Sequence, residues 1–139
     1  MKTNIALLIE QSVNVIDSLN KGLRLTPEEQ QFFCEHFERE EIKKNEFTIR
    51  IGDYEKYLYF IESGILRYWT AQEYGDPDKE ITFWFSFPGE FANSYFSLKE
   101  NQPSLIHIQA LTDCVIWKLS KLDLADLYQT SLNINKIAR

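Results

Sequence analysis

The residues best suited to chemistry lie between Pro88 and Leu111, in the stretch PGEFANSYFSLKENQPSLIHIQAL. Phe91, Tyr95 and Leu98 are spaced i, i+4 and i+7, which predicts one short helix with a single apolar face. A helix that begins near Phe91 leaves its first backbone N–H groups without intrahelical partners, and such groups attract anions. The free N–H groups near Phe91, Ala92 and Asn93 therefore predict a site for an anion.

Two predicted strands position this helix. The strand before it has apolar residues at alternate positions, which is typical of a half-buried strand: Ile81, Phe83, Phe85 and Phe87. Pro88-Gly89 then predicts a turn, and residues 99–104 form a polar loop. The second strand resumes the alternation with Ile106, Ile108 and Ala110.

This order of strand, turn, short helix, loop and strand resembles the phosphate-binding cassette of the cyclic-nucleotide-binding domain in Crp/Fnr-type bacterial transcription regulators. The resemblance covers roughly residues 20–139 and also includes a strand–Gly–strand signature at residues 57–69, with Gly64 as its glycine. Other matching segments are Gly89-Glu90-Phe91, residues 108–111 and residues 114–119. The resemblance implies a mainly β jelly-roll barrel with flanking helices, which serves as the effector-sensing domain of a regulator.

Three positions depart from the members of that family that bind cyclic AMP. In those members a Glu of the short helix holds the ribose hydroxyl, and an Arg-Ser pair after the loop holds the cyclic phosphate. The matching residues here are Ser94, Ser104 and Leu105, and Lys99 is the one cation between Ser94 and Ser104. A buried phosphate needs a charge-assisted partner, so we expect no binding of cyclic AMP in the usual way. The effector is unidentified and no cofactor is expected.

The candidate pocket therefore combines hydroxyls, aromatic rings and an amide, which suit a small polar or weakly anionic molecule. Its predicted members are Phe91, Asn93, Ser94, Tyr95, Ser104, Leu105 and Arg67. The alternative is an eroded pocket, in which Phe91 and Tyr95 are core residues and the barrel is a scaffold for dimerisation.

Other chemistry is poorly supported. A jelly-roll metalloenzyme of the cupin kind needs several His and a carboxylate around one metal, but the chain has two histidines, His36 and His107, and no His-x-His. We therefore predict no metal site and no enzyme activity. The two cysteines, Cys34 and Cys114, are expected to be free thiols, because an iron–sulfur cluster needs about four thiolates.

The length and the net charge of the chain limit its domain organisation and its partners. A chain of 139 residues predicts a single domain. The net charge of −6 disfavours duplex DNA as a direct partner of this domain. No apolar run approaches the ~18 residues of a membrane span, and no signal peptide is visible, which predicts no membrane contact and a cytoplasmic protein.

The expected organisation is helical at both ends. Helices are predicted over about residues 4–38, the barrel over about 40–119, and further helices from about 121. Ser120 predicts a helix cap, with Leu122, Leu124 or Ala125, and Leu127 or Tyr128 as the buried face. In the resembled family the next segment, which begins here near Leu132, leads to a winged-helix DNA-binding domain that this sequence lacks. DNA contact and homodimerisation are therefore expected only in a full-length protein.

Overall fold

The computed structural model describes residues 35–72 and 74–130, so most of the helical region predicted over about residues 4–38 lies outside the described part. Within that part the chain forms eight strands and two helices. In chain order they are β1 (Glu38–Ile42), β2 (Phe47–Ile49), β3 (Tyr57–Ser63), β4 (Leu66–Ala71), β5 (Glu80–Ser86), β6 (Phe91–Ala92), α3 (Tyr95–Glu100), β7 (His107–Ala110), β8 (Cys114–Ser120) and α4 (Lys121–Thr130).

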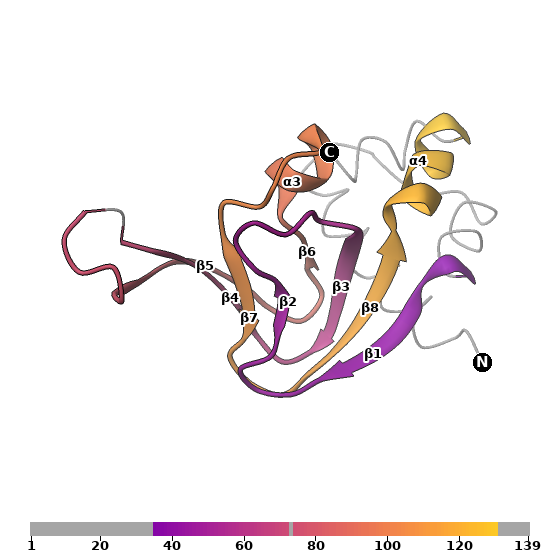
Figure 1. Cartoon of the computed structure of the whole chain (residues 1–139). Coiled ribbons are helices and arrows are strands. Elements are labelled where there is room, and N and C mark those ends of the chain that lie inside the picture. The colour runs from indigo at the N-terminus through magenta and orange to yellow at the C-terminus, as the bar shows by residue number, and fades with distance from the viewer. Residues whose placement is uncertain (1–34, 73, 131–139) are drawn as a thin grey trace, which may run out of the picture.

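The strands form two four-stranded sheets whose pairings are all antiparallel. One sheet has the order β1-β8-β3-β6 and the other the order β2-β7-β4-β5. The two sheets enclose one core, and its completely buried members include Ile61, Leu66, Ile108 and Ile116. Figure 1 shows this arrangement, with α4 following β8 at one end of the barrel. The predicted jelly-roll fold is confirmed.

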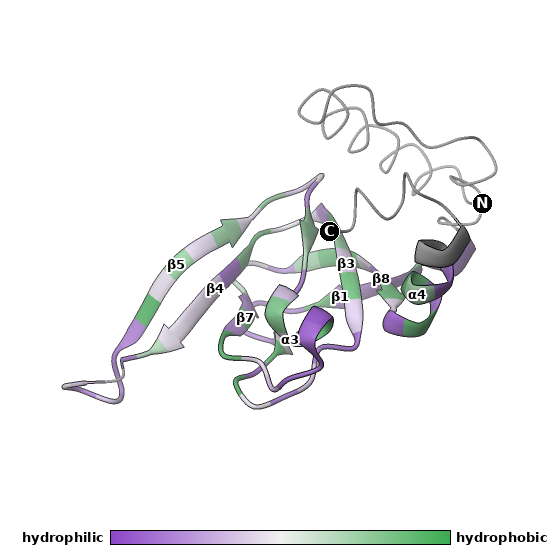
Figure 2. Ribbon diagram, turned by 90° about the horizontal axis from the view of Figure 1, so that it is seen from above, coloured by the Kyte–Doolittle hydropathy of each residue, from purple (hydrophilic) through white to green (hydrophobic). Residues whose placement is uncertain are grey.

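The strand β5 departs from its predicted half-buried state. Its alternate apolar residues Ile81, Phe83 and Phe85 are between 38% and 51% exposed, and Trp84 is 63% exposed. β5 is an edge strand that pairs with β4 alone, and its register with β4 shifts between Tyr68 and Trp69. Ile81 therefore pairs with Thr70 and Phe85 with Arg67, on opposite faces of the sheet, so the predicted apolar face is not continuous. Figures 1 and 2 show the β4–β5 hairpin reaching well beyond the rest of the barrel. Its side chains therefore present apolar surface to the outside of the described fold.

The predicted helix from Phe91 to Leu98 begins four residues later than expected. Phe91 and Ala92 form β6, which pairs with Phe60 and Tyr59 of β3. The rings of Phe91 and Phe60 lie 5.3 Å apart in an edge-to-face contact, so Phe91 packs against a strand partner and is not on a helix face. The helix α3 runs from Tyr95 and ends where Asn101 adopts a left-handed conformation.

The ends of the described chain agree with the sequence in part. The Asp123 N–H donates to Ser120 Oγ at 3.1 Å, which confirms the predicted cap of α4. Leu124 is buried, but Leu122 is 80% exposed, so Leu122 was wrongly placed on the buried face. Leu127 and Tyr128 have side chains outside the description. Neither of the described helices has the length and apolar composition needed to cross a membrane.

The turn at Gly64 joins β3 to β4 and confirms the strand–Gly–strand prediction. Gly64 has φ +91°, a conformation that L residues avoid. A Cβ placed on Gly64 would lie 2.5 Å from both the Asp113 carbonyl oxygen and Cys114 Sγ. Gly52 has nearly the same φ, +94°, but a Cβ there would meet no heavy atom within 4 Å.

Alanine substitutions at Gly52 and Gly64 distinguish the cost of backbone strain from the cost of steric overlap. We expect Gly52→Ala to lower the free energy of unfolding by about 1–2 kcal/mol, the cost of a left-handed L residue. Gly64→Ala adds the displacement of the β8 backbone and should lower it by at least ~2 kcal/mol more. Urea denaturation of the two variants measures the difference, and equal losses would contradict the predicted overlap.

Candidate functional site

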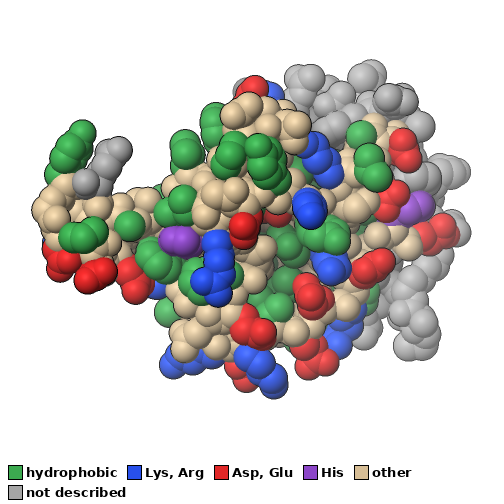
Figure 3. Space-filling view, in the orientation of Figure 1, with side chains coloured by type: hydrophobic (Ala, Val, Ile, Leu, Met, Phe, Trp, Pro, Cys, Tyr) green, Lys and Arg blue, Asp and Glu red, His purple; other side chains and the backbone are tan. Residues whose placement is uncertain are grey.

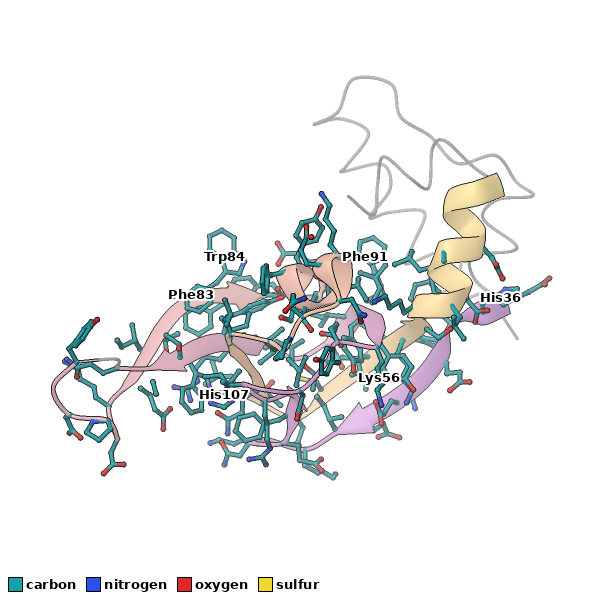
Figure 4. The ribbon with its side chains drawn as sticks, turned by 45° about the horizontal axis from the view of Figure 1, so that its top comes forward. His36, Lys56, Phe83, Trp84, Phe91 and His107 are labelled. Atoms are coloured by element: carbon teal, nitrogen blue, oxygen red, sulfur yellow. The ribbon has the colours of Figure 1, made fainter. Side chains whose placement is uncertain are left out.

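An apolar hollow lies between the β4–β5 hairpin and α3. Its volume is about 360 Å³, and its lining residues are Tyr68, Phe83, Trp84, Asn93, Ser94, Tyr95, Phe96, Leu105 and Ile106. Four of the seven predicted pocket residues line it: Asn93, Ser94, Tyr95 and Leu105. Figure 4 labels Phe83 and Trp84 on the hairpin side of this hollow, beside α3.

Ser94 and Ser104 meet beneath the hollow. Their hydroxyl oxygens are 2.8 Å apart, and both residues are buried. Ser104 Oγ donates to the Ile106 carbonyl oxygen at 2.8 Å and accepts from the Ile106 N–H at 3.2 Å. Because each hydroxyl has one proton, the Ser94 hydroxyl must be the donor in the Ser94–Ser104 bond. Both hydroxyl protons are therefore used inside the protein.

The carboxylate of Glu55 occupies the start of α3. Glu55 Oε2 accepts the Ser94 N–H at 2.9 Å, and Oε1 accepts the N–H groups of Lys56 and Tyr57 at 3.2 and 3.3 Å. The Glu55 N–H in turn donates to Ser97 Oγ at 2.8 Å. Glu55 thus ties the chain before β3 to the first turn of α3.

Burial controls the ionisation of this carboxyl group. Glu55 is 3% exposed. Desolvation raises its pKa from the usual 4.5 to about 7, and the three backbone N–H donors only partly offset that rise. The site therefore contains a carboxyl group that titrates near neutral pH without a cation to pair with it in the described part of the chain.

The free backbone N–H groups predicted near Phe91, Ala92 and Asn93 are not available. Phe91 and Ala92 belong to β6, the Asn93 N–H donates to the Tyr68 hydroxyl, and the Ser94 N–H donates to Glu55. The prediction of an anion site at the start of this helix was therefore wrong. Its physical reason is that an internal carboxylate and an internal phenol have taken the donors.

Arg67 lies on the opposite face of β4 from the hollow. Its guanidinium forms an ion pair with Glu80 and hydrogen bonds with Thr82 and with Gln109, which Trp69 also contacts. Tyr68 points the other way and lines the hollow, because neighbouring residues of a strand face opposite sides. The structure does not bring Arg67 together with the other predicted pocket residues.

Phe91, another predicted pocket residue, and His107 also lie outside the hollow. Phe91 packs on Phe60 and is seen on the far side of α3 from Trp84 (Figure 4). His107, one of the two histidines of the sequence, has its ring 4.3 Å from that of Trp69, and its Nδ1 accepts the Ile51 N–H at 3.1 Å. Desolvation and the nearby Arg50 lower the pKa of His107.

The hollow is uncharged, although charge surrounds it. None of its lining residues has an ionisable acid or base other than the phenols of Tyr68 and Tyr95. Lys99 lies near the rim, with its Nζ 5.5 Å from the centre of the Tyr95 ring. Figure 3 shows acidic and basic side chains intermixed over one face of the barrel. In the described residues no group of three or more His, Cys, Asp or Glu converges to hold a metal.

A second hollow, of about 380 Å³, lies beside the segment between β2 and β3. Its lining is more polar and includes Asp53, Glu55 and Lys56. It does not include the cassette residues Ser94, Ser104 or Leu105, so we assign the candidate site to the apolar hollow.

Sequence reasoning missed Glu55 and five of the nine residues that line the hollow, which are Tyr68, Phe83, Trp84, Phe96 and Ile106. Glu55 stands among other charged residues, and nothing in that pattern distinguishes a buried acid from a solvated one. Tyr68 could have been found, since it alternates with the buried Leu66 on β4. Phe83 and Trp84 are neighbours on one strand, and the period-two pattern placed only Phe83 on the inner face.

The raised pKa of Glu55 predicts a pH-dependent stability. The folded protein keeps the Glu55 proton between pH 4.5 and about 7, where the unfolded chain has already released it. Proton binding therefore stabilises the folded state at low pH, and this contribution to the free energy of unfolding is lost as the pH rises through about 7. The loss is on the order of 3 kcal/mol. We expect Glu55→Gln, which cannot titrate, to show a correspondingly flatter free energy of unfolding between pH 4.5 and 8. Denaturant titrations across this range measure it, and equal slopes in both proteins would contradict the assignment.

The family model described as "Cyclic nucleotide-binding domain" matches residues 39–131, more than half of the chain. No curated protein sequence matches. Three solved structures with the same fold are the catabolite activator protein of Thermus thermophilus, the regulatory domain of Toxoplasma gondii protein kinase A crystallised with cyclic AMP, and a cyclic nucleotide-binding domain from Methylobacillus flagellatus.

These likenesses are close in shape and distant in sequence. The TM-scores are 0.70, 0.77 and 0.76, with 23%, 14% and 16% identity in the same order. The matches cover 81%, 99% and 96% of this chain, and 51%, 48% and 72% of the other chains. The chain therefore spans about half the length of the first two proteins. On the family match and the fold, the chain belongs to the cyclic nucleotide-binding domain family.

Proposed function

We propose that this domain is the effector-sensing part of a Crp/Fnr-type transcription regulator and that it does not bind cyclic AMP in the usual way. The hydrogen bond between Ser94 and Ser104 carries the proposal. It occupies the two positions at which the cyclic AMP-binding members of the family have a Glu and an Arg. The function that this site supports is binding rather than catalysis.

The energetic argument concerns the phosphate. Each charge-assisted hydrogen bond is worth about 1.5–3 kcal/mol, so losing the ribose and phosphate partners would cost roughly 3–6 kcal/mol if the losses were additive. That corresponds to about two to four powers of ten in affinity. Leu105 adds nothing in return, because its side chain has no donor for a phosphate oxygen.

No other cation of the described residues is well placed to replace the missing Arg. Arg67 is held on the opposite face of β4 by Glu80 and Gln109. Lys99 lies over the Tyr95 ring, near the rim of the hollow, and a lysine offers a single point charge rather than a bidentate fork.

Cyclic AMP should therefore bind weakly. By calorimetry on the full chain at neutral pH, we expect dissociation constants for cyclic AMP and cyclic GMP near the millimolar range or weaker. A dissociation constant below about ten micromolar would overturn the proposal.

The reverse design tests whether the pocket outline persists. The triple variant Ser94→Glu, Ser104→Arg and Leu105→Ser should gain at least about tenfold in affinity for cyclic AMP. The matched control adds the same charges at two exposed sites, Leu122→Glu and Tyr74→Arg, and should gain nothing. No gain in the triple variant would favour a closed pocket.

A scaffold function is the second candidate. It is favoured by the burial of Ser94 and Ser104, whose hydroxyls already have partners and need no ligand. The metalloenzyme alternative has less support, since His107 Nδ1 already accepts the Ile51 N–H. We assign contact with DNA and dimerisation to a longer protein, because a net charge of −6 disfavours duplex binding by this domain.

A further inference from the structure

We propose that the hollow between α3 and the β4–β5 hairpin binds an uncharged, flat aromatic compound with one hydrogen-bonding group. The inference rests on the proposed function, since it names the class of effector for the same site. It replaces the polar or weakly anionic ligand that the sequence suggested.

The size and the walls of the hollow set the first limit. Its volume of about 360 Å³ falls within the range of small-molecule sites, roughly 300–1,000 Å³. The walls come from three segments, which are the hairpin, α3 with the residues before it, and the chain before β7. A hollow of this size can take a compound of two or three aromatic rings.

Aromatic rings dominate the lining. Tyr68 and Phe83 meet edge to face with ring centres 6.2 Å apart, and Trp84 and Phe96 keep much of their surface exposed. Exposed ring faces beside a hollow offer stacking surface, and a flat ring compound would remove that apolar area from water. The rings therefore favour an aromatic ligand over a branched aliphatic one.

Asn93 supplies a polar group with both a donor and an acceptor. Its side chain lines the hollow and, within the described residues, makes no hydrogen bond. A carboxamide can pair with a hydroxyl, a carbonyl or a ring nitrogen of a ligand. One such group in an apolar site gives orientation to a ligand that is otherwise held by packing.

Charge excludes the competing occupants. The lining has no Lys, Arg, Asp or Glu, and the chain has a net charge of −6. An anionic ligand would lose its hydration without gaining a cation in the hollow. A second copy of this acidic chain would add like charges to the same interface, which disfavours it as the occupant.

Two probes of the same shape test the inference on the full chain. N-phenyl-1-naphthylamine is neutral, and 1-anilinonaphthalene-8-sulfonate carries a sulfonate on nearly the same rings. We expect the neutral probe to bind one site per chain with a micromolar dissociation constant, by fluorescence titration. The anionic probe should bind at least about tenfold more weakly, because its charge has no partner in the hollow. Equal or tighter binding of the anionic probe would overturn the inference.

Matched variants locate the bound probe. Leu105 lines the hollow and is 64% exposed, whereas Leu122 is 80% exposed on α4 and lies outside the lining. We expect Leu105→Glu to weaken the neutral probe at least tenfold and Leu122→Glu to change it less than twofold. Similar effects of the two variants, or several bound probes per chain, would show surface adsorption and overturn the inference. Sedimentation of both variants provides the other check, since loss of a dimer in Leu105→Glu alone would assign the hollow to a second copy.

The failures of the two proposals are distinguishable. Micromolar binding of cyclic AMP overturns the proposed function, whatever the naphthyl probes do. Absence of probe binding, together with millimolar cyclic AMP, overturns only the ligand class and leaves the cassette unable to hold a nucleotide.

Discussion

The buried carboxylate of Glu55 holds the cassette in place. It reaches from the chain before β3 to the Ser94 N–H at the start of α3, while its other oxygen accepts two N–H groups of its own segment. Ser94 makes no side-chain cap for α3, because its hydroxyl is bonded to Ser104. The helix start is therefore satisfied by a residue 39 positions earlier in the chain.

This arrangement inverts the electrostatics that an anion site requires. Free N–H groups at the start of a helix attract negative charge, but here a carboxyl group of the protein already accepts the Ser94 N–H. The nearest strand residue with a guanidinium, Arg67, faces the other way and is bonded to Glu80. Next to α3 there is an apolar hollow with one side-chain amide. Such a site recognises a ligand by packing rather than by its charge.

Features with a local cause could be predicted from the sequence. Gly64 marks a turn with positive φ, and Ser120 caps the helix that follows β8. The alternation of apolar residues placed Ile108 and Ala110 in the core. Each of these depends on neighbours along the chain, whereas the jelly-roll fold was predicted from the resemblance to a known family.

Features that depend on contacts between distant strands and helices could not be predicted. The alternation predicted for β5 is interrupted, because its register with β4 shifts between Tyr68 and Trp69, so that Phe85 pairs with Arg67 while Trp84 pairs with Tyr68, which lines the hollow. Phe91 satisfied a helical spacing, yet pairing with Phe60 placed it in β6. Three of the seven predicted pocket residues do not line the hollow. Ser104 lies beneath it, bonded to Ser94, whereas strand pairing turns Arg67 and Phe91 away from it.

The edge position of β5 also bears on how such a pocket diversifies. Buried residues such as Ile61 and Ile116 are constrained by close packing, and most changes there lower stability. Phe83 and Trp84 line the hollow from a hairpin that packs little of their surface against the barrel. Substitutions in β5 can therefore alter what the hollow accepts at small cost to folding, whereas substitutions in the barrel behind it lower the free energy of unfolding.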